Sequence, residues 1–172
     1  LAVTGRRGLM RGDTEELHVG GDPGLNFACI DEVPHNVRIR LTVRPGADAN
    51  AFGICLRGEG DYAAGNELRF EPKNGRVQWA HPQEGELAAP APASLLMDGD
   101  VRALAGSVTG LDRSFTLDVV LKDRIVDVCI DNRRTFIASR PADSGLGGHR
   151  LFFFSEDGEV LFESIEIRPL LP

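Results

Sequence analysis

The sequence has few cysteines and no long hydrophobic run. Its three cysteines, Cys29, Cys55 and Cys129, lie far apart, and none has the Cys-x-x-Cys spacing that is typical of zinc sites. We therefore predict neither a disulfide framework nor a metal site, and we expect the cysteines to fill strands as small apolar side chains. No apolar run reaches the roughly 18 residues that a membrane-spanning helix needs, and no signal-peptide pattern is present. A membrane is therefore not an expected partner.

Positive charge is also scarce. The chain has 19 Lys and Arg residues against 26 Asp and Glu residues, which gives a formal net charge of −7. Nucleic-acid binding requires clustered cations that neutralise phosphates, so nucleic acid is excluded as a partner and a neutral or cationic partner is favoured. The odd number of thiols slightly favours the cytoplasm, and secretion from a bacterium is the alternative.

Sustained helical periodicity is absent, whereas glycine (20) and proline (10) are abundant. Short stretches instead alternate apolar and polar residues, most clearly in Val37–Arg44 and Phe115–Leu121. About a dozen such stretches recur at a spacing of roughly 8–12 residues, which is typical of an antiparallel β-sandwich. We therefore predict an all-β protein with two packed antiparallel sheets.

The domain organisation follows from where this pattern begins. Leu1–Asp13 is rich in Gly and Arg and lacks periodicity, so we predict a connecting segment, with a late-packing strand as the alternative. Residues 14–172 are predicted to form a single β-sandwich domain, which is long enough to bury a core without disulfides. The Ala- and Pro-rich stretch His81–Ser94 is predicted to be a surface excursion within that domain.

The stretch Ser114–Arg140 is the most regular part of the chain and predicts consecutive antiparallel strands. Val126, Val128 and Ile130 are expected in the core, with Asp127, Cys129 and Asp131 on the opposite face. Asp127 and Asp131 would be about 13 Å apart along a strand, which is too far for the carboxylate pair of a glycoside hydrolase. A solvated strand face is the better interpretation, and no catalytic residue is predicted.

Three stretches resemble the C-terminal β-sandwich of family-32 glycoside hydrolases, the invertase, inulinase and levanase group. They are KDRIVDVCIDN over Lys122–Asn132, GEVLFESIEIRPL over Gly158–Leu170, and Phe52–Trp79 with LRFEP at its centre. The family commonly has Asp-Arg-Ser-Ser-Val-Glu-Val-Phe where this chain has Asp-Arg-Ile-Val-Asp-Val-Cys, so the related levan-binding module of carbohydrate-binding family 66 is equally open. Both resemblances imply a concanavalin-like, lectin-like jelly roll.

The resemblance also implies a role. The catalytic propeller of these enzymes and its Asn-Asp-Pro, Arg-Asp-Pro and Glu-Cys motifs are absent from this sequence. The chain would therefore be a non-catalytic accessory module of a fructan-processing glycoside hydrolase, which braces a catalytic domain of the same polypeptide and binds fructan or another glycan. The alternatives are a stand-alone carbohydrate-active enzyme and a protein-interaction module on the same scaffold.

A sugar site usually shows exposed aromatic side chains, yet this chain has one Trp and one Tyr. Fructofuranose offers little flat apolar surface, so a fructan site could instead use charged hydrogen bonds from Arg and carboxylate groups. By strand parity, Arg57, Glu67 and Arg69 share the non-core faces of neighbouring strands, and Tyr62 lies in the loop between them. These four are the predicted carbohydrate-binding residues, with ion pairing on an exposed sheet as the alternative. Trp79 has the parity of a core residue.

Cofactors and metals are not expected. The four histidines lack metal-ligand spacing and have no nucleophile elbow beside them. The loop between residues 59 and 67 has oxygen donors without the spacing of an EF-hand, which leaves calcium as the alternative to no metal.

Overall fold

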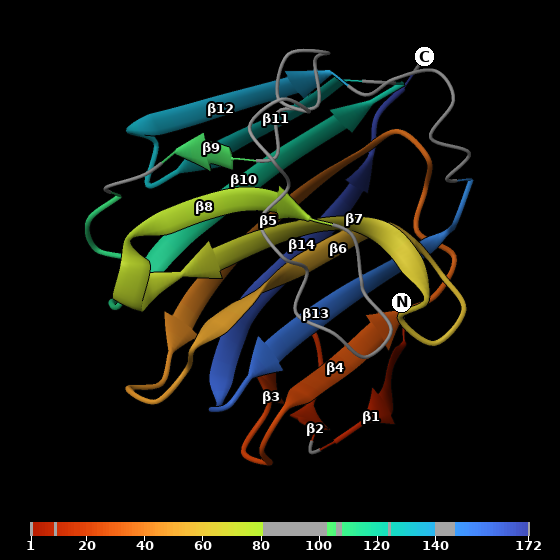
Figure 1. Cartoon of the computed structure of the whole chain (residues 1–172). Helices are drawn as coiled ribbons and strands as arrows, with labels where there is room; N and C mark the ends of the chain where they lie inside the picture. Colours follow the sequence, from red (N-terminus) through yellow and green to blue (C-terminus); the bar gives the residue numbers. More distant parts are fainter. Residues whose placement is uncertain are drawn as a thin grey trace.

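The computed structural model describes residues 2–8, 10–80, 103–105, 108–123, 125–139 and 147–171. Within them, two antiparallel sheets of seven strands lie face to face (Figure 1). The strand order in sheet A is β1 (Val3–Arg7), β4 (Leu25–Ile30), β13 (Arg150–Glu156), β6 (Ala51–Glu59), β7 (Ala64–Glu71), β8 (Arg76–Ala80) and β9 (Ala103–Ala105). The strand order in sheet B is β12 (Arg134–Ser139), β11 (Ile125–Ile130), β10 (Phe115–Lys122), β5 (Val37–Pro45), β14 (Val160–Pro169), β3 (Glu16–Val19) and β2 (Met10–Gly12). The predicted two-sheet β-sandwich is confirmed.

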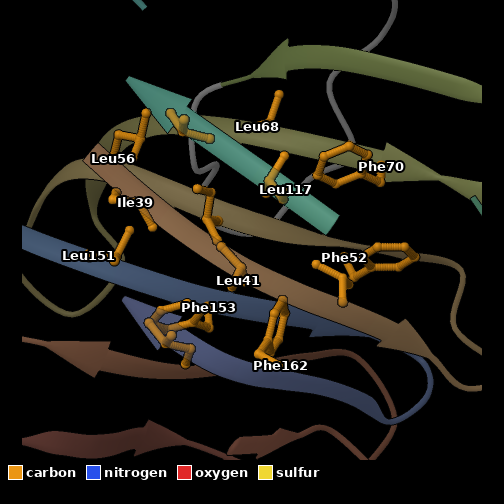
Figure 2. Close-up of a cluster of buried hydrophobic side chains, with 14 of the residues drawn as sticks. Ile39, Leu41, Phe52, Leu56, Leu68, Phe70, Leu117, Leu151, Phe153 and Phe162 are labelled. Carbon is orange, nitrogen blue, oxygen red and sulfur yellow. The ribbon is translucent and has the colours of Figure 1, made fainter. Parts of the chain in front are cut away.

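The core lies between the two sheets and consists of the alternating apolar side chains of both (Figure 2). Ile39, Phe52 and Phe70 are fully buried there, and the Phe52 and Phe70 rings stack with centroids 5.7 Å apart. Each buried side chain of this kind contributes roughly 1.5–3 kcal/mol to stability, so the register of a strand that lines this core is fixed by its apolar face.

The structure confirms most of the strand register that was predicted for Ser114–Arg140. Val126, Val128 and Ile130 are buried, and β11 pairs with β10 and β12. Asp131, however, does not share the strand face with Asp127. It follows the end of β11 in a turn, with a φ of 52°, and its carboxylate accepts a hydrogen bond of 2.8 Å from the Thr116 N–H. The prediction that Asp127 and Asp131 lie on one strand face is wrong because β11 ends at Ile130, before Asp131.

The N-terminal segment, predicted to be a connection, supplies an edge strand to each sheet. Strand β1 pairs with β4 and strand β2 pairs with β3. An edge strand is held by backbone hydrogen bonds on one side and can do without a periodic apolar face, which explains the missing sequence signal. The predicted excursion His81–Ser94 lies outside the described residues.

The turn between β7 and β8 is a short 3₁₀ helix, η1 (Pro72–Asn74), that ends at Gly75. Gly75 has a φ of 57°, in the left-handed region where glycine meets no Cβ penalty. This turn brings the end of β7 to one end of the sandwich, beside the loop that joins β5 to β6 (Figure 1).

The edge of sheet B carries a histidine held between two carboxylates. His18 Nδ1 lies 2.9 Å from Glu159 Oε1, and His18 Nε2 lies 2.9 Å from Glu16 Oε1. The hydrogen bonds with Glu16 and then Glu159 raise the pKa of His18, while partial burial and the nearby Arg11 oppose the rise. The imidazolium form is therefore favoured in the folded protein.

Stability is expected to depend on the protonation of His18. The folded pKa of His18 is raised, so the protonated imidazole stabilises the fold. This stabilisation is fully present below the pKa of His18 in the unfolded chain, about 6.5, and is lost as the pH rises through the folded pKa. The stability advantage of the wild type over His18→Gln should therefore shrink as the pH rises from about 6.5 through the folded pKa. Urea unfolding of both proteins measures it, and an advantage that grows with pH would contradict the prediction.

Candidate functional site

The face of sheet A that points away from the core carries most of the predicted site residues. On this face, the pairing register places Arg69 beside Gly53, and Gly53 beside Phe154. Strand β6 presents small side chains here, because Ala51, Gly53 and Cys55 alternate with core residues. Small residues on β6 therefore separate the charged side chains of β7 from the aromatic side chains of β13.

Arg69 is the centre of this face. Its Nη1 and Nη2 atoms donate to the two carboxylate oxygens of Glu156 at 2.8 and 2.5 Å, which is a bidentate pair that reaches across β6. The same guanidinium donates to Glu67 and to Glu71, each at 3.2 Å. Its carbon lies 6.0 Å from the centroid of the Phe154 ring, within the range of a cation–π contact. Only 15% of the Arg69 side chain is exposed.

The absence of a side chain at Gly53 makes this geometry possible. A Cβ atom there would lie 1.9 Å from the Leu68 carbonyl oxygen and 3.1 Å from the Phe154 ring. Glycine thus lets β6 and β7 approach closely and leaves room for the arginine to reach Glu156.

Glu71 links Arg69 to strand β8 through side-chain hydrogen bonds. Its carboxylate accepts hydrogen bonds from Arg69, Arg76, Gln78 and Asn74. Burial opposes its ionisation, but the hydrogen bonds from Asn74, Arg76 and Arg69 outweigh this and lower the pKa of Glu71. The side chain is an anion near neutral pH that fixes the position of its four donors.

Tyr62 and Glu67 form a buried pair at the other end of the face. The Tyr62 hydroxyl donates to Glu67 Oε2 at 2.8 Å, and the Tyr62 ring stacks on Phe27 with centroids 5.0 Å apart. Burial raises the pKa of the Tyr62 hydroxyl well above its ordinary value. Burial also raises the pKa of Glu67, against the lowering effect of Arg69 and Tyr62. Because Tyr62 is 6% exposed, its ring is not presented for stacking on a sugar.

Beneath Tyr62 lies a second apolar cluster, separate from the main core. It contains Phe27, Cys29, Cys55, Phe152 and Phe154, all buried. Strand β13 is thus covered on both faces, which agrees with its nearly continuous apolar sequence. This apolar cluster lies directly beneath the charged network, with Phe154 in contact with Arg69.

Three of the four predicted residues come together here and one does not. Tyr62, Glu67 and Arg69 share hydrogen bonds, whereas Arg57 Nη2 donates to the Asp123 carbonyl oxygen at 2.6 Å. The register of β6 against β7 shifts between Leu56 and Glu59, so the parity argument fails at Arg57. Arg57 has a φ of 51° and lies at the opposite end of the sheet from Glu71.

Sequence reasoning missed Glu71 and Glu156. Glu71 has the same strand parity as Glu67 and Arg69, so a longer reading of the same face would have found it. Glu156 is 87 residues from Arg69 in the chain and no local signal connects them. The pairing of β13 with β6 is what brings it to the site.

The arrangement suits ligand binding better than hydrolysis. Glu67, whose pKa is raised, would be the candidate acid of a glycosidase, but it is 4% exposed and its carboxylate already bonds to Tyr62 and Arg69. The described residues contain no group of three or more His, Cys, Asp or Glu side chains that could hold a metal ion. Nor does any helix of the described chain have the length and apolarity to span a membrane.

A scan of the sequence against protein-family models finds no match, and a search of curated proteins finds none. Solved structures do match. The carbohydrate-binding module CBM66 from Bacillus subtilis has a TM-score of 0.67 and 12% sequence identity over 97% of this chain and 95% of that chain. A candidate glycosyl hydrolase from Parabacteroides distasonis has a TM-score of 0.62 and 15% identity, with coverage of 99% and 89%. A galectin from Caenorhabditis elegans has a TM-score of 0.54 and 17% identity, with coverage of 90% and 96%. These similarities confirm the predicted lectin-like fold.

Proposed function

We propose that this chain is a non-catalytic carbohydrate-binding β-sandwich module, with a site centred on Arg69 and Glu156 and a fructan as its ligand. The observation that carries the proposal is the bidentate Arg69–Glu156 pair on the outer face of sheet A. The Glu156 side of this pair is exposed to solvent, and a buried apolar cluster lies beneath the pair. The carbohydrate-binding module and the galectin among the similar structures support a glycan as the ligand class.

The pair offers donors and acceptors side by side. Each Glu156 oxygen accepts one hydrogen bond from Arg69 and keeps a second lone pair, and Arg69 Nη2 has one N–H without an acceptor among the described residues. A sugar hydroxyl both donates and accepts, so two neighbouring hydroxyls can bind to this edge at once. Glu156 is 30% exposed, which leaves its carboxylate accessible.

A fructan fits this chemistry better than a pyranose polymer does. Pyranose recognition usually relies on an exposed aromatic platform. Here the aromatic rings of Tyr62, Phe152 and Phe154 are buried, and charged hydrogen bonds form the exposed edge. A furanose, with its smaller flat apolar surface, depends less on stacking and more on such bonds.

We further propose that the module accompanies a fructan-processing glycoside hydrolase and braces its catalytic domain. The resemblance of the sequence to the C-terminal module of family-32 enzymes supports this role, as does the candidate glycosyl hydrolase among the similar structures. A reading frame that encodes this chain without any catalytic domain would contradict it.

Binding is expected to weaken when Glu156 loses its charge. Glu156→Gln retains the shape of the side chain but removes one acceptor and the ion pair, so we expect about a tenfold loss of affinity for levan or inulin. Isothermal titration with levan, inulin and sucrose measures it. The matched control is Glu163→Gln, which breaks the Arg44–Glu163 pair on sheet B and should leave the affinity unchanged. Absence of binding heat from the wild type with all three sugars would overturn the proposal.

A further inference from the structure

A cleft of about 590 Å³ lies at the end of the sandwich where β7 ends, within the size range of small-molecule sites. Three segments line it: the loop between β5 and β6, the η1 turn, and residues 108–113 before β10. All three meet at one end of the two sheets (Figure 1).

Backbone hydrogen bonds hold the segments that line the cleft. The Val108 N–H donates to the Gly75 carbonyl oxygen at 2.7 Å, which joins the third segment to the η1 turn. The Gly46 N–H donates to the Glu159 carbonyl oxygen at 2.8 Å, and a Cβ atom at Gly46 would lie 2.6 Å from that oxygen. The cleft is therefore preformed, so a ligand would not have to order its walls.

The lining combines small apolar groups with polar groups at the rim. Ala49 and Val108 are buried in it, while Lys73, Asp112 and Arg113 are exposed around it. Within the described part of the chain, neither Lys73 nor Arg113 has a carboxylate partner at ion-pair distance. Both cations can thus donate to the hydroxyl and ring oxygens of a sugar, and Asp112 can accept.

A continuous polar path connects the cleft to the Arg69 site. Lys73 Nζ donates to Asn50 Oδ1, and Asn50 Nδ2 donates to Asp157 Oδ2 at 2.8 Å. Asp157 is the neighbour of Glu156, which binds Arg69. Along β7, Arg69 and Glu71 are two residues apart, about 6.7 Å, and η1 follows directly. The cleft is therefore connected to Arg69 both along β7 and η1 and through the hydrogen bonds of Asn50 and Asp157.

From this continuity we infer that the cleft is a chain-extension subsite. It binds further units of the same polysaccharide that is bound at Arg69 and Glu156, with Lys73 and Arg113 as donors and Ala47 at the rim. The inference rests on the proposed function and deepens it, because it adds a second binding position for the same sugar chain.

Chain length tests the inference. Wild-type protein is titrated with sucrose and with levan oligosaccharides of increasing length from the disaccharide upward. We expect the affinity to rise about tenfold as the chain becomes long enough to reach the cleft. The double variant Lys73→Ala/Arg113→Ala should lose this gain and keep the affinity for the disaccharide. Ala47→Trp, at an exposed position, should do the same by blocking the cleft with the polar groups intact.

The controls separate this inference from the proposed function. Lys122→Ala/Arg168→Ala removes two exposed cations at the other end of sheet B and should retain the full gain with length. Equal affinity at every length, with short ligands still bound, would overturn the subsite and leave the proposed function standing. Loss of disaccharide binding in both cleft variants would also overturn it, because the cleft would then belong to the first site. No binding at any length would overturn both.

Discussion

Arg69→Met is expected to destabilise the protein by about 3–5 kcal/mol, which is the usual cost of removing one partner of a buried ion pair. Arg69 is the shared counter-charge of Glu67, Glu71 and Glu156, and its side chain is 15% exposed. The carboxylates of Glu67 and Glu71 are at most 10% exposed. Methionine fills part of the volume but leaves these anions without their common donor.

This destabilisation should depend on pH with a definite sign. Without Arg69, the pKa of Glu67, already raised by burial, rises further, because the arginine is its main lowering influence. A carboxyl group whose folded pKa lies above the unfolded value of about 4.3 destabilises the fold once it must ionise. The deficit of Arg69→Met should therefore be largest at neutral pH and shrink as the pH falls toward about 4.

Chemical denaturation of the wild type and the variant at several pH values measures both effects. The control is Arg38→Met on the outer face of sheet B, where Arg38 pairs with Asp118 in a similar bidentate geometry but is 46% exposed. Exposed pairs of this kind contribute little, so the control should change stability only slightly. Equal, small losses in both variants would show that the Arg69 network is an ordinary surface ion-pair cluster.

The Arg69 network also marks how far the sequence predicts the site. Tyr62, Glu67 and Arg69 were predicted because strand parity is a local property: residues two apart on one strand share a face. Glu156 could not be predicted, since it reaches Arg69 through the register of β13 against β6, a long-range property. Arg57 was predicted to join them and does not, because a register shift in β6 interrupts the parity at that residue.

The same distinction applies to the fold. The alternation in β5 and β10 predicted their buried faces correctly, because each strand has one wet and one apolar side. The nearly continuous apolar run in β13 is typical of a strand buried on both faces, but it carries no sign that the outer face lies under Tyr62. The edge strands β1 and β2 left no periodic trace, since they contribute backbone hydrogen bonds more than buried side chains.

The second large effect concerns Phe154, which lies under the charged network. Phe154→Ala is expected to cost about 3–5 kcal/mol, as for other buried phenylalanines replaced by alanine. The side chain is fully buried, its ring is 5.8 Å from that of Tyr62, and the Arg69 guanidinium lies over it. The cavity would therefore open directly below both Tyr62 and Arg69.

Phe162→Ala is the matched comparison. Phe162 is also fully buried, but it packs in the main core against Phe153, with ring centroids 5.2 Å apart. Both variants should unfold at lower denaturant concentration by similar amounts. Only Phe154→Ala should also weaken glycan binding at a temperature where both proteins are folded, because only that cavity lies next to Arg69.

Titration of the two folded variants with levan separates the alternatives. If the apolar cluster on the outer face of sheet A serves stability alone, the two variants bind equally well, and the proposed link between that cluster and the site is wrong. If it positions the arginine, Phe154→Ala binds about tenfold more weakly than Phe162→Ala, since misplacing the donor loses roughly one charged hydrogen bond. A second aromatic cluster outside the main core would then be explained by ligand binding, because the Phe154 ring would fix Arg69 in the position from which it donates to the glycan.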